Sequence, residues 1–558
     1  MRARRLAAPA HLALGALLLA GLALRVHNID HGLPWVYHAD EALHFTNRAV
    51  GMFGGDANPH YFQNPSAYTY IVHLVLRFGH GWPFTSAGEI LADYRADPTP
   101  FYEAARWVAT LLCLAGAAAV FAVGRRLWGA AAGLAAAAIL TFAFLPVAYS
   151  RLALTDVGAF LPVALATYAN VQVLEDGRRR WFAIAGAAIG LAVGFKYTAG
   201  LLVVPLLVAA ALRWRDERAA GRRVERADAL RDLGIALGLV AAVFLITTPY
   251  FLLDLESALY QLKEQARSAG IEKLGQARDG SFVFYLRTLT WGFGWIPALA
   301  ALAGIVLETR RDRRRALLIG LFPALLFAYI VIGADRYFAR WLMPAYPVLA
   351  LFAGVAIARA AAALTTRPAL RAGALAALVA AALVQPVIAD VRTSRLLGRE
   401  DTRAMTRDFV LNELPAGTPA VVEPAVPDGF FGDHLRLGFG PPPKTARNRA
   451  GGPTRFIRSL SPARVERYRA AGFCTVITMS LVRDRALAKD TARIDGYYRA
   501  LQRQGRVIFH ASPYKPGAKP VPFDFDWSTH LYYPRAYERP GPEVTVYRLD
   551  RCRERARP

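Results

Sequence analysis

The chain has 558 residues, of which 55% are hydrophobic, and it carries a formal net charge of +25. Its mean hydropathy of +0.26 is too high for a set of soluble domains and indicates an integral membrane protein. The positive charge does not indicate nucleic-acid binding. Before residue 390 most basic residues stand in short runs between apolar segments, as in the cytoplasmic loops of membrane proteins.

Apolar stretches long enough to span a bilayer recur through the first 390 residues. The N-terminal stretch follows three arginines and resembles a signal peptide. Arg25 directly after it, without a clear small-x-small cleavage site, favours a retained anchor. We expect an α-helical multi-pass membrane protein with about eleven spans, at residues 7–26, 104–123, 129–148, 157–174, 181–195, 198–212, 233–250, 289–307, 316–333, 342–358 and 372–388.

The charges of the loops indicate which side of the membrane each loop faces. When the spans alternate, all the arginine-rich loops fall on one side, and the positive-inside rule identifies that side as the cytoplasm. The N-terminus is then cytoplasmic, and the outer side carries residues 27–103, the turn at 149–151, residues 251–288 and everything after 391. The arginine-rich pieces are residues 2–5, 125–126, 178–180, 213–231, 310–315 and 367–371.

The outer segment 251–288 contains an amphipathic pattern. Leu252, Leu255 and Leu259 repeat at helical spacing, opposite Lys263 and Arg267. This pattern predicts a helix that lies in the membrane interface rather than one that crosses the bilayer. We therefore assign residues 1–390 to one transmembrane domain with a large first outer loop (27–103) and this interfacial helix.

After residue 391 the composition changes. Short strand-like runs at 420–422, 474–477, 507–509 and 544–547 alternate with helical patterns at 402–414, 463–471 and 485–504. We predict a soluble extracytoplasmic α/β domain over residues 391–558, with an irregular segment rich in Pro and aromatic residues at 514–540. A Cys474–Cys552 disulfide is one alternative for the tail if it faces an oxidising compartment; free thiols are the other.

The most informative stretch is residues 35–44, which includes the adjacent carboxylates Asp40 and Glu41 just beyond the first span. The simplest interpretation is a helix N-terminus whose dipole these acids complement. Asp40 and His44 also have the four-residue spacing of metal ligands, and seven of the eleven histidines fall between residues 27 and 80. The other histidines have no matching spacing, so we expect no metal and no cofactor, with a divalent metal as the alternative.

Further polar residues stand at the outer ends of spans. Asp156 resembles a helix cap, Lys196 resembles a snorkelling lysine, and Arg336 with Tyr337 resembles an interfacial belt. Each simple interpretation is reasonable alone. Together with Asp40, however, these residues place acids and cations from four separate segments at the same membrane level. That is what a site for an anionic lipid substrate requires.

In their order and sidedness these residues resemble the C-type (GT-C) polyprenyl-phosphate-dependent glycosyltransferases, in particular the protein O-mannosyltransferases and the aminoarabinose transferase of lipid A. The resemblance covers about residues 10–360. Where related enzymes often carry Lys-Pro, this chain has Asn64-Pro65, so a cation that would meet the donor phosphate is missing. The matching residues are Asp40-Glu41, Tyr61-Phe62-Gln63-Asn64-Pro65, Ser150-Arg151 with Asp156, Gly194-Phe195-Lys196 and Arg336-Tyr337 with Pro344-Ala345-Tyr346-Pro347.

The resemblance implies an inverting enzyme that moves a hexosyl or pentosyl group from a polyprenyl-phosphate-sugar to a hydroxyl of a glycan, lipid or protein acceptor. It also implies that Asp40 is the general base. Glu41, about 100° further round a helix, is expected to orient Asp40 or to bind the acceptor. Arg336 and Lys196 are expected to stabilise the departing phosphate. Tyr61, Asn64, Arg151, Asp156 and Tyr337 complete the expected substrate-binding set.

We expect the protein in a bacterial inner membrane, surrounded by membrane lipids, with its site and its C-terminal domain on the periplasmic or extracellular side. Two other functions fit parts of the pattern. A transporter or lipid flippase would place charged residues at mid-span, whereas Asp156, Lys196 and Arg336 all stand near one face. A membrane-anchored binding protein that acts through its tail would not need so many polar groups in the first outer loop.

Overall fold

The computed structural model describes residues 2–80, 85–221, 226–276, 279–440, 452–487 and 491–554. The chain divides into two compact units. The first comprises Met1–Pro34, Ala39–Ile271 and Asp279–Arg392; the second comprises Trp35–His38, Glu272–Arg278 and Thr393–Pro558. Two short pieces from earlier in the chain, Trp35–His38 and Glu272–Arg278, therefore belong to the same unit as the tail, which the sequence did not indicate.

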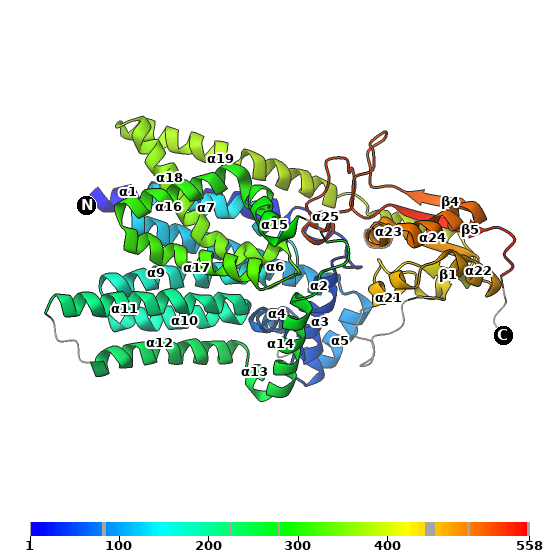
Figure 1. Ribbon diagram of the computed structural model, residues 1–558, viewed down its shortest axis with the longest axis horizontal. Coiled ribbons are helices and arrows are strands. Elements are labelled where there is room, and N and C mark those ends of the chain that lie inside the picture. The colour runs from blue at the N-terminus through cyan, green and yellow to red at the C-terminus, as the bar shows by residue number, and fades with distance from the viewer. Residues whose placement is uncertain are drawn as a thin grey trace. The chain divides into compact units, whose positions relative to one another are not determined.

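The first unit is a helical bundle (Figure 1). Its long helices are α1 (Arg2–Val26), α6 (Thr99–Trp128), α7 (Ala130–Phe142), α8 (Phe144–Ser150), α9 (Phe160–Glu175), α10 (Arg179–Phe195), α11 (Val203–Ala219), α12 (Arg226–Thr247), α16 (Trp295–Arg311), α17 (Arg313–Ile332), α18 (Tyr346–Leu364) and α19 (Pro368–Leu397). Short 3-10 segments precede three of these helices: η2 (Asp156–Ala159), η3 (Tyr197–Leu202) and η5 (Ala339–Ala345).

Within the described ranges, nine helices are long and apolar enough to cross a membrane, and a tenth span results if the bent pair α7 and α8 is counted as one. The angle between α7 and α8 is 55°. The remaining predicted span is α10, which has 17 residues and is therefore about 26 Å long. The predicted multi-pass helical architecture is confirmed.

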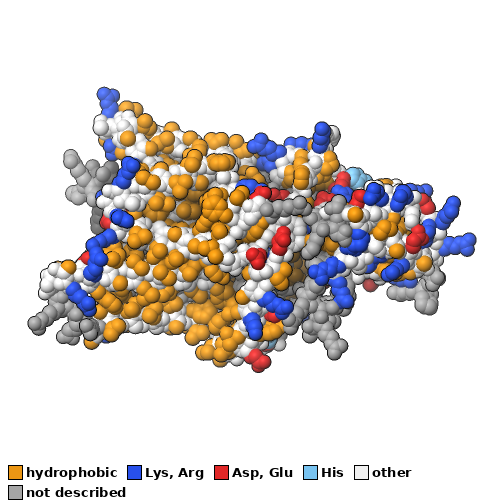
Figure 2. All heavy atoms as spheres, viewed as in Figure 1, with side chains coloured by type: hydrophobic (Ala, Val, Ile, Leu, Met, Phe, Trp, Pro, Cys, Tyr) orange, Lys and Arg blue, Asp and Glu red, His pale blue; other side chains and the backbone are white. Residues whose placement is uncertain are grey.

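The outer surface of the bundle is apolar. Ile246, Leu299 and Ile332 are 75%, 61% and 84% exposed, as expected for side chains that face lipid rather than water. Figure 2 shows hydrophobic side chains across the bundle and Lys and Arg along the edge where α11 ends and α12 begins. Arg315 joins the helix ends at this edge: it donates to the carbonyl of Leu127 and pairs with Glu175 at 3.4 Å. The arginine-rich loops near residues 125, 178 and 313 thus lie at the same end of the bundle.

Helix α12 packs on α10 through backbone contact. A methyl group at Gly190 would lie 2.6 Å from the carbonyl oxygen of Val240, and one at Gly186 would collide with the carbonyl oxygen of Ala236. Small residues at such an interface let two membrane helices approach closely. Close packing stabilises the pair through van der Waals contacts, because the hydrophobic effect does not favour helix association within lipid.

The loops that connect the long helices of the first unit contain short helices. Helix α14 exposes Leu255 and Leu259 and has the amphipathic character predicted for an interfacial helix. The predicted segment 251–288 is too long, however, because Gly280–Thr288 is a separate helix (α15) that continues through a π-helical turn (η4, Leu289–Gly294) into α16. The other short elements are α2 (Ala39–Leu43), α3 (Thr46–Gly51), η1 (Met52–Gly54), α4 (Ala67–Gly79), α5 (Ala87–Ala96), α13 (Tyr250–Leu253) and α14 (Leu255–Ala269).

The second unit contains a five-stranded mixed sheet of order β2-β1-β3-β5-β4. β1 (Thr418–Val422) pairs in parallel with β2 (Leu435–Leu437) and β3 (Thr475–Met479), and β5 (Val544–Leu549) is antiparallel to β3 and β4 (Gly505–Ala511). The described helices are α20 (Thr402–Glu413), η6 (Gly432–His434), α21 (Gly452–Arg458), α22 (Pro462–Ala470), α23 (Ser480–Leu487), α24 (Thr491–Gln504) and α25 (Phe525–Thr529).

Both faces of this sheet are covered. Val421 and Val476 lie in one hydrophobic cluster, whereas their neighbours Ala420 and Ile477 lie in another. This alternation follows from the two-residue repeat of a strand. The α/β character predicted for the tail is confirmed. The sequence did not predict the three-residue strand β2 or the short helices η6, α21 and α25, and the predicted helix 485–504 covers parts of two helices, α23 and α24.

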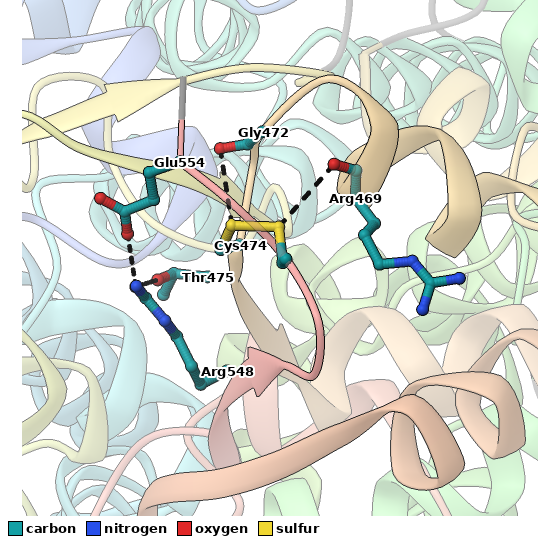
Figure 3. Close-up of a disulfide and its surroundings, with 7 residues drawn as sticks. Arg469, Gly472, Cys474, Thr475, Arg548 and Glu554 are labelled. Atoms are coloured by element: carbon teal, nitrogen blue, oxygen red, sulfur yellow. Dashed lines mark hydrogen bonds and ion pairs between the residues drawn. A yellow bond between two sulfur atoms is a disulfide. The ribbon is translucent and has the colours of Figure 1, made fainter. Parts of the chain in front are cut away.

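A disulfide joins Cys474, directly before β3, to Cys552, beyond the end of β5 (Figure 3). Their Cα atoms are 5.5 Å apart. Of the two alternatives for these cysteines, the structure therefore shows the bridge. Nearby, Arg548 pairs with Glu554 at 2.5 Å and donates to the hydroxyl of Thr475. Cys113 remains a buried thiol in the first unit.

Candidate active site

Asp40 lies in the first turn of α2 and forms an ion pair with Arg340. The Asp40 Oδ2 atom is 2.5 Å from Nη1 of Arg340, which lies in the first turn of η5. The Asp40 side chain is 32% exposed and that of Arg340 is 15% exposed. The hydroxyl of the buried Tyr149 accepts a further hydrogen bond from Arg340. A carboxylate that water can reach is thus paired with Arg340.

A second ion pair joins Lys196 and Asp156. The Lys196 Nζ atom is 2.6 Å from Asp156 Oδ1, and both side chains are almost fully buried. Lys196 follows the end of α10, and Asp156 begins η2. Arg340 interacts electrostatically with both Asp40 and Asp156, so the two pairs belong to one cluster. The cluster contains two carboxylates and two cations, and each cation is already paired with a carboxylate.

Tyr61 and Asn64 lie beside this cluster. The imidazole of His44 stacks on the Tyr61 ring, with centroids 4.3 Å apart, and its Nε2 lies 4.0 Å from Asp40. Asn64 donates a hydrogen bond to the Tyr61 hydroxyl at 2.7 Å. Burial and then the charge of Asp40 raise the pKa of Tyr61, so this phenol remains neutral. Gln261 of α14 accepts a hydrogen bond from the Phe62 amide and fixes this segment.

Glu41 has a different environment from Asp40. Arg106 of α6 donates from Nε to Glu41 Oε1 at 2.7 Å and from Nη2 to Oε2 at 2.9 Å, and the Ala153 amide also donates to Oε1. Glu41 is 0% exposed and Arg106 is 1% exposed. Arg106 also donates to the carbonyls of Ile29 and His31, so this pair ties the chain after α1 to α6.

Arg151 is buried in the bundle rather than beside Asp40. It donates to the carbonyl of Leu24, and the electrostatic partner that favours its charge is Asp390 of α19. The preceding residue, Ser150, accepts a hydrogen bond from Arg25 at 2.8 Å. Arg151 therefore links α1, the end of α8 and α19, and its contact with a substrate stays a prediction.

Arg336 and Tyr337 have contacts outside the two ion pairs. Arg336 donates from Nε to the carbonyl of Ile271 at 3.1 Å, and partial burial lowers its pKa. The Tyr337 ring packs against Phe284 of α15, with centroids 4.6 Å apart. The cation that the structure places on Asp40 is Arg340, four positions after Arg336.

The reason lies in the backbone before η5. Phe338 is extended, with φ −139° and ψ 138°, and the 3-10 helix begins only at Ala339. Arg340 thus stands in the first helical turn while Arg336 remains in the segment before it. Arg340 and Tyr149 are the two site residues that the sequence analysis did not select. The signal for Arg340 was present, because it stands in the same polar segment as Arg336 at the start of a span.

The described part of the chain contains no group of three or more His, Cys, Asp or Glu side chains that could hold a metal ion. Asp40 and His44 are the pair with ligand spacing, and the structure places Arg340 on the carboxylate of that pair. The arrangement offers a carboxylate that can accept a proton and two cations that can neutralise a phosphate.

Comparison with known proteins supports this fold. Residues 102–246 match the family model described as dolichyl-phosphate-mannose-protein mannosyltransferase. No match was found among curated proteins.

Solved structures of low sequence identity share the fold. ArnT from Cupriavidus metallidurans bound to undecaprenyl phosphate matches with 16% identity and a TM-score of 0.53, over 98% of this chain and 99% of that chain. The oligosaccharyltransferase of Archaeoglobus fulgidus in its apo form matches with 12% identity and a TM-score of 0.54, over 97% and 88%. The protein is therefore a multi-pass membrane protein with the fold of the GT-C glycosyltransferases, as the resemblance in its sequence implied.

Proposed function

We propose that this protein is a membrane glycosyltransferase that moves a sugar from a polyprenyl-phosphate carrier to an acceptor hydroxyl. The observation that carries the proposal is the cluster of Asp40 and Asp156 with Arg340 and Lys196 at one end of the bundle. The match to a mannosyltransferase family model and the fold shared with an undecaprenyl-phosphate-bound ArnT support the lipid-phosphate donor.

In the proposed reaction, the acceptor oxygen attacks the anomeric carbon and the bond from that carbon to the phosphate oxygen breaks. The acceptor proton passes to Asp40, and the electron pair of the broken bond leaves with the polyprenyl phosphate. Attack opposite the leaving group inverts the anomeric configuration. The base and the cations that receive the phosphate are both present in the cluster, so this chemistry needs no redox partner.

The two ion pairs give the reaction an order. While Arg340 holds Asp40, the carboxylate is stabilised as an anion and is a poor proton acceptor. A donor phosphate that attracts Arg340 and Lys196 would release Asp40 and Asp156, so the base becomes effective only after the donor binds. Arginine suits this exchange because its planar guanidinium can bind two phosphate oxygens at once.

The other residues follow from their surroundings. Because Arg106 and the Ala153 amide occupy both oxygens of Glu41, we assign Glu41 the orienting role rather than acceptor binding. Tyr61 and Asn64 are hydrogen-bonded to each other, and Tyr61 lies near Asp40. Asn64 is neutral, so it cannot supply the cation that related enzymes have at this position. Arg340, with Lys196, takes the phosphate-binding role that the sequence suggested for Arg336.

We also propose a bacterial inner membrane as the location, with the N-terminus in the cytoplasm and the site and the C-terminal domain outside. The contacts of Arg315, which join three of the arginine-rich loops at one end of the bundle, support this orientation. The Cys474–Cys552 disulfide supports an oxidising compartment for the tail.

The direct test uses purified protein in proteoliposomes with undecaprenyl-phosphate-linked sugars that carry a radiolabel. We expect label to leave the lipid in the presence of a hydroxyl acceptor, and Asp40→Asn to reduce this rate at least about 10²-fold while donor binding persists. Near wild-type transfer by Asp40→Asn would exclude Asp40 as the base. Loss of activity with a chelator would instead favour a metal site. Movement of intact donor across the bilayer without transfer would favour the flippase alternative.

A further inference from the structure

The second unit includes four residues of the first outer loop, Trp35–His38. The chain passes from His38 through the single residue Ala39 to Asp40. Helix α2, which carries Asp40, has only five residues, and a helix of that length has little stability of its own. The direction in which Asp40 points therefore depends on the segments that hold the chain on either side of it.

Trp35 and Tyr37 are held by arginines of α20. The guanidinium carbon of Arg403 lies 3.7 Å from the centroid of the Tyr37 ring, and that of Arg407 lies 4.9 Å from the centroid of Trp35. Both rings also pack edge-to-face against Phe430, with centroids 5.0 and 6.0 Å away. Cation–π contacts of this kind strengthen when the cation is shielded from water.

These arginines are themselves fixed. Arg403 is 8% exposed and donates two hydrogen bonds to Asp401, at 2.8 and 2.7 Å. Arg407 donates to the carbonyl of Phe430 at 2.7 Å. On the loop, His38 is buried with its Nε2 3.0 Å from the carbonyl oxygen of Thr529.

Val36, between the two aromatic residues, has a φ of +28°. A β-branched residue rarely adopts this conformation unless its surroundings impose it. Val36 is also 5% exposed, so it is packed rather than free in solvent. We call Trp35–His38 with Arg403, Arg407 and Phe430 the clasp.

We infer that the clasp is a positioning device for the transfer reaction and that Tyr37 is its central positioning residue. Tyr37, held by Arg403, restrains the chain three residues before the base and so restricts the directions in which the Asp40 carboxylate can point. The Glu41–Arg106 pair fixes the chain on the other side of Asp40. The inference deepens the proposed function and rests on Asp40 being the base.

The expected effect is on turnover rather than on donor binding. A misplacement of about 1 Å at a reacting group can reduce a rate about 10²-fold. Tyr37→Ala should therefore lower kcat about 10-fold to 100-fold, while the KM for the lipid donor changes less than about twofold. Tyr37→Phe keeps the ring face under Arg403 and should restore kcat. Tyr37→Ala combined with Arg403→Ala should lose no more than either change alone, because the two residues act as one unit.

The experiment uses the full-length protein in nanodiscs and has a readout that needs no turnover. A nitroxide on Ala39→Cys reports the mobility of the segment before Asp40, and Tyr37→Ala should increase that mobility. Arg436→Ala is the matched control, because Arg436 lies over the Phe473 ring at 5.3 Å elsewhere in the second unit. This control should leave both kcat and nitroxide mobility unchanged.

Unchanged kcat in Tyr37→Ala would overturn the inference, whatever the nitroxide shows. So would a loss of activity that merely follows the amount of folded protein, or an equal effect of Arg436→Ala. If the wild-type protein transfers no sugar, the proposed function fails instead. In that case the nitroxide still decides whether the clasp holds the segment.

Discussion

Replacing Glu41 by Gln should destabilise the membrane unit strongly. Glu41 is fully buried and accepts two hydrogen bonds from the equally buried Arg106, so water cannot supply the missing counter-charge. Removing one partner of a buried ion pair costs about 3–5 kcal/mol. Glutamine keeps one acceptor oxygen and the size of the side chain, so we expect the lower end, about 3 kcal/mol.

Unfolding in mixed micelles of increasing SDS fraction measures this loss. Asp228→Asn is the matched control, because both side chains of the Asp228–Arg231 pair are about half exposed and such pairs contribute about 0.2–1 kcal/mol. A double variant, Glu41→Leu with Arg106→Met, should recover much of the stability, because a buried ion pair is often replaceable by apolar side chains of similar volume.

The kinetics of Glu41→Gln distinguish its two candidate roles. An orienting residue should lower kcat and leave the KM for the acceptor within about twofold, because the acceptor does not touch it. Wild-type stability together with a tenfold higher acceptor KM would refute this reasoning. Glu41 would then be open to the acceptor, contrary to its burial against Arg106 and Ala153.

Three further predictions concern other parts of the molecule. Arg340→Lys should lower the rate of sugar transfer about tenfold or more although it keeps the charge, because lysine cannot bind two phosphate oxygens at once. Arg336→Ala should bind labelled donor normally. The reverse result would assign the phosphate-binding role to Arg336. Replacing Cys474 and Cys552 by Ser should lower stability by about 4 kcal/mol, seen as an earlier denaturant midpoint, because the bridge closes a loop of 78 residues. Burial raises the pKa of Glu423 from 4.5 to about 8. The folding stability should therefore fall as the pH rises between these two values and stay level above them. Thermal unfolding of Glu423→Gln at several pH values should show no such fall in stability.

The sequence was most informative where structure depends on neighbouring residues. Apolar length located the spans, and alternation located β1, β3, β4 and β5. β2 has only three residues and too short a pattern to detect. The sequence analysis included the helix α15 in the interfacial segment 251–288, whereas this helix continues through a π-helical turn into the next span.

The sequence predicted those site residues that come together because the spans beside them end on the same side of the membrane. Asp40, Asp156 and Lys196 follow different spans and meet because those spans end on the same side. The choice between Arg336 and Arg340 depends on where η5 begins, which Phe338 decides through an extended backbone that no residue pattern marks. The partner of Glu41 was equally hidden, since Arg106 lies on a different helix.

The compensated charges of the cluster have a consequence for how a substrate arrives. The charges of Asp40, Asp156, Lys196 and Arg340 sum to zero, so this cluster exerts little long-range attraction on a phosphate in solution. A lipid-linked donor does not need such attraction, because diffusion within the bilayer already confines its search to two dimensions. Its rate of capture should therefore depend on its density in the membrane and hardly at all on ionic strength, unlike capture by an uncompensated basic pocket.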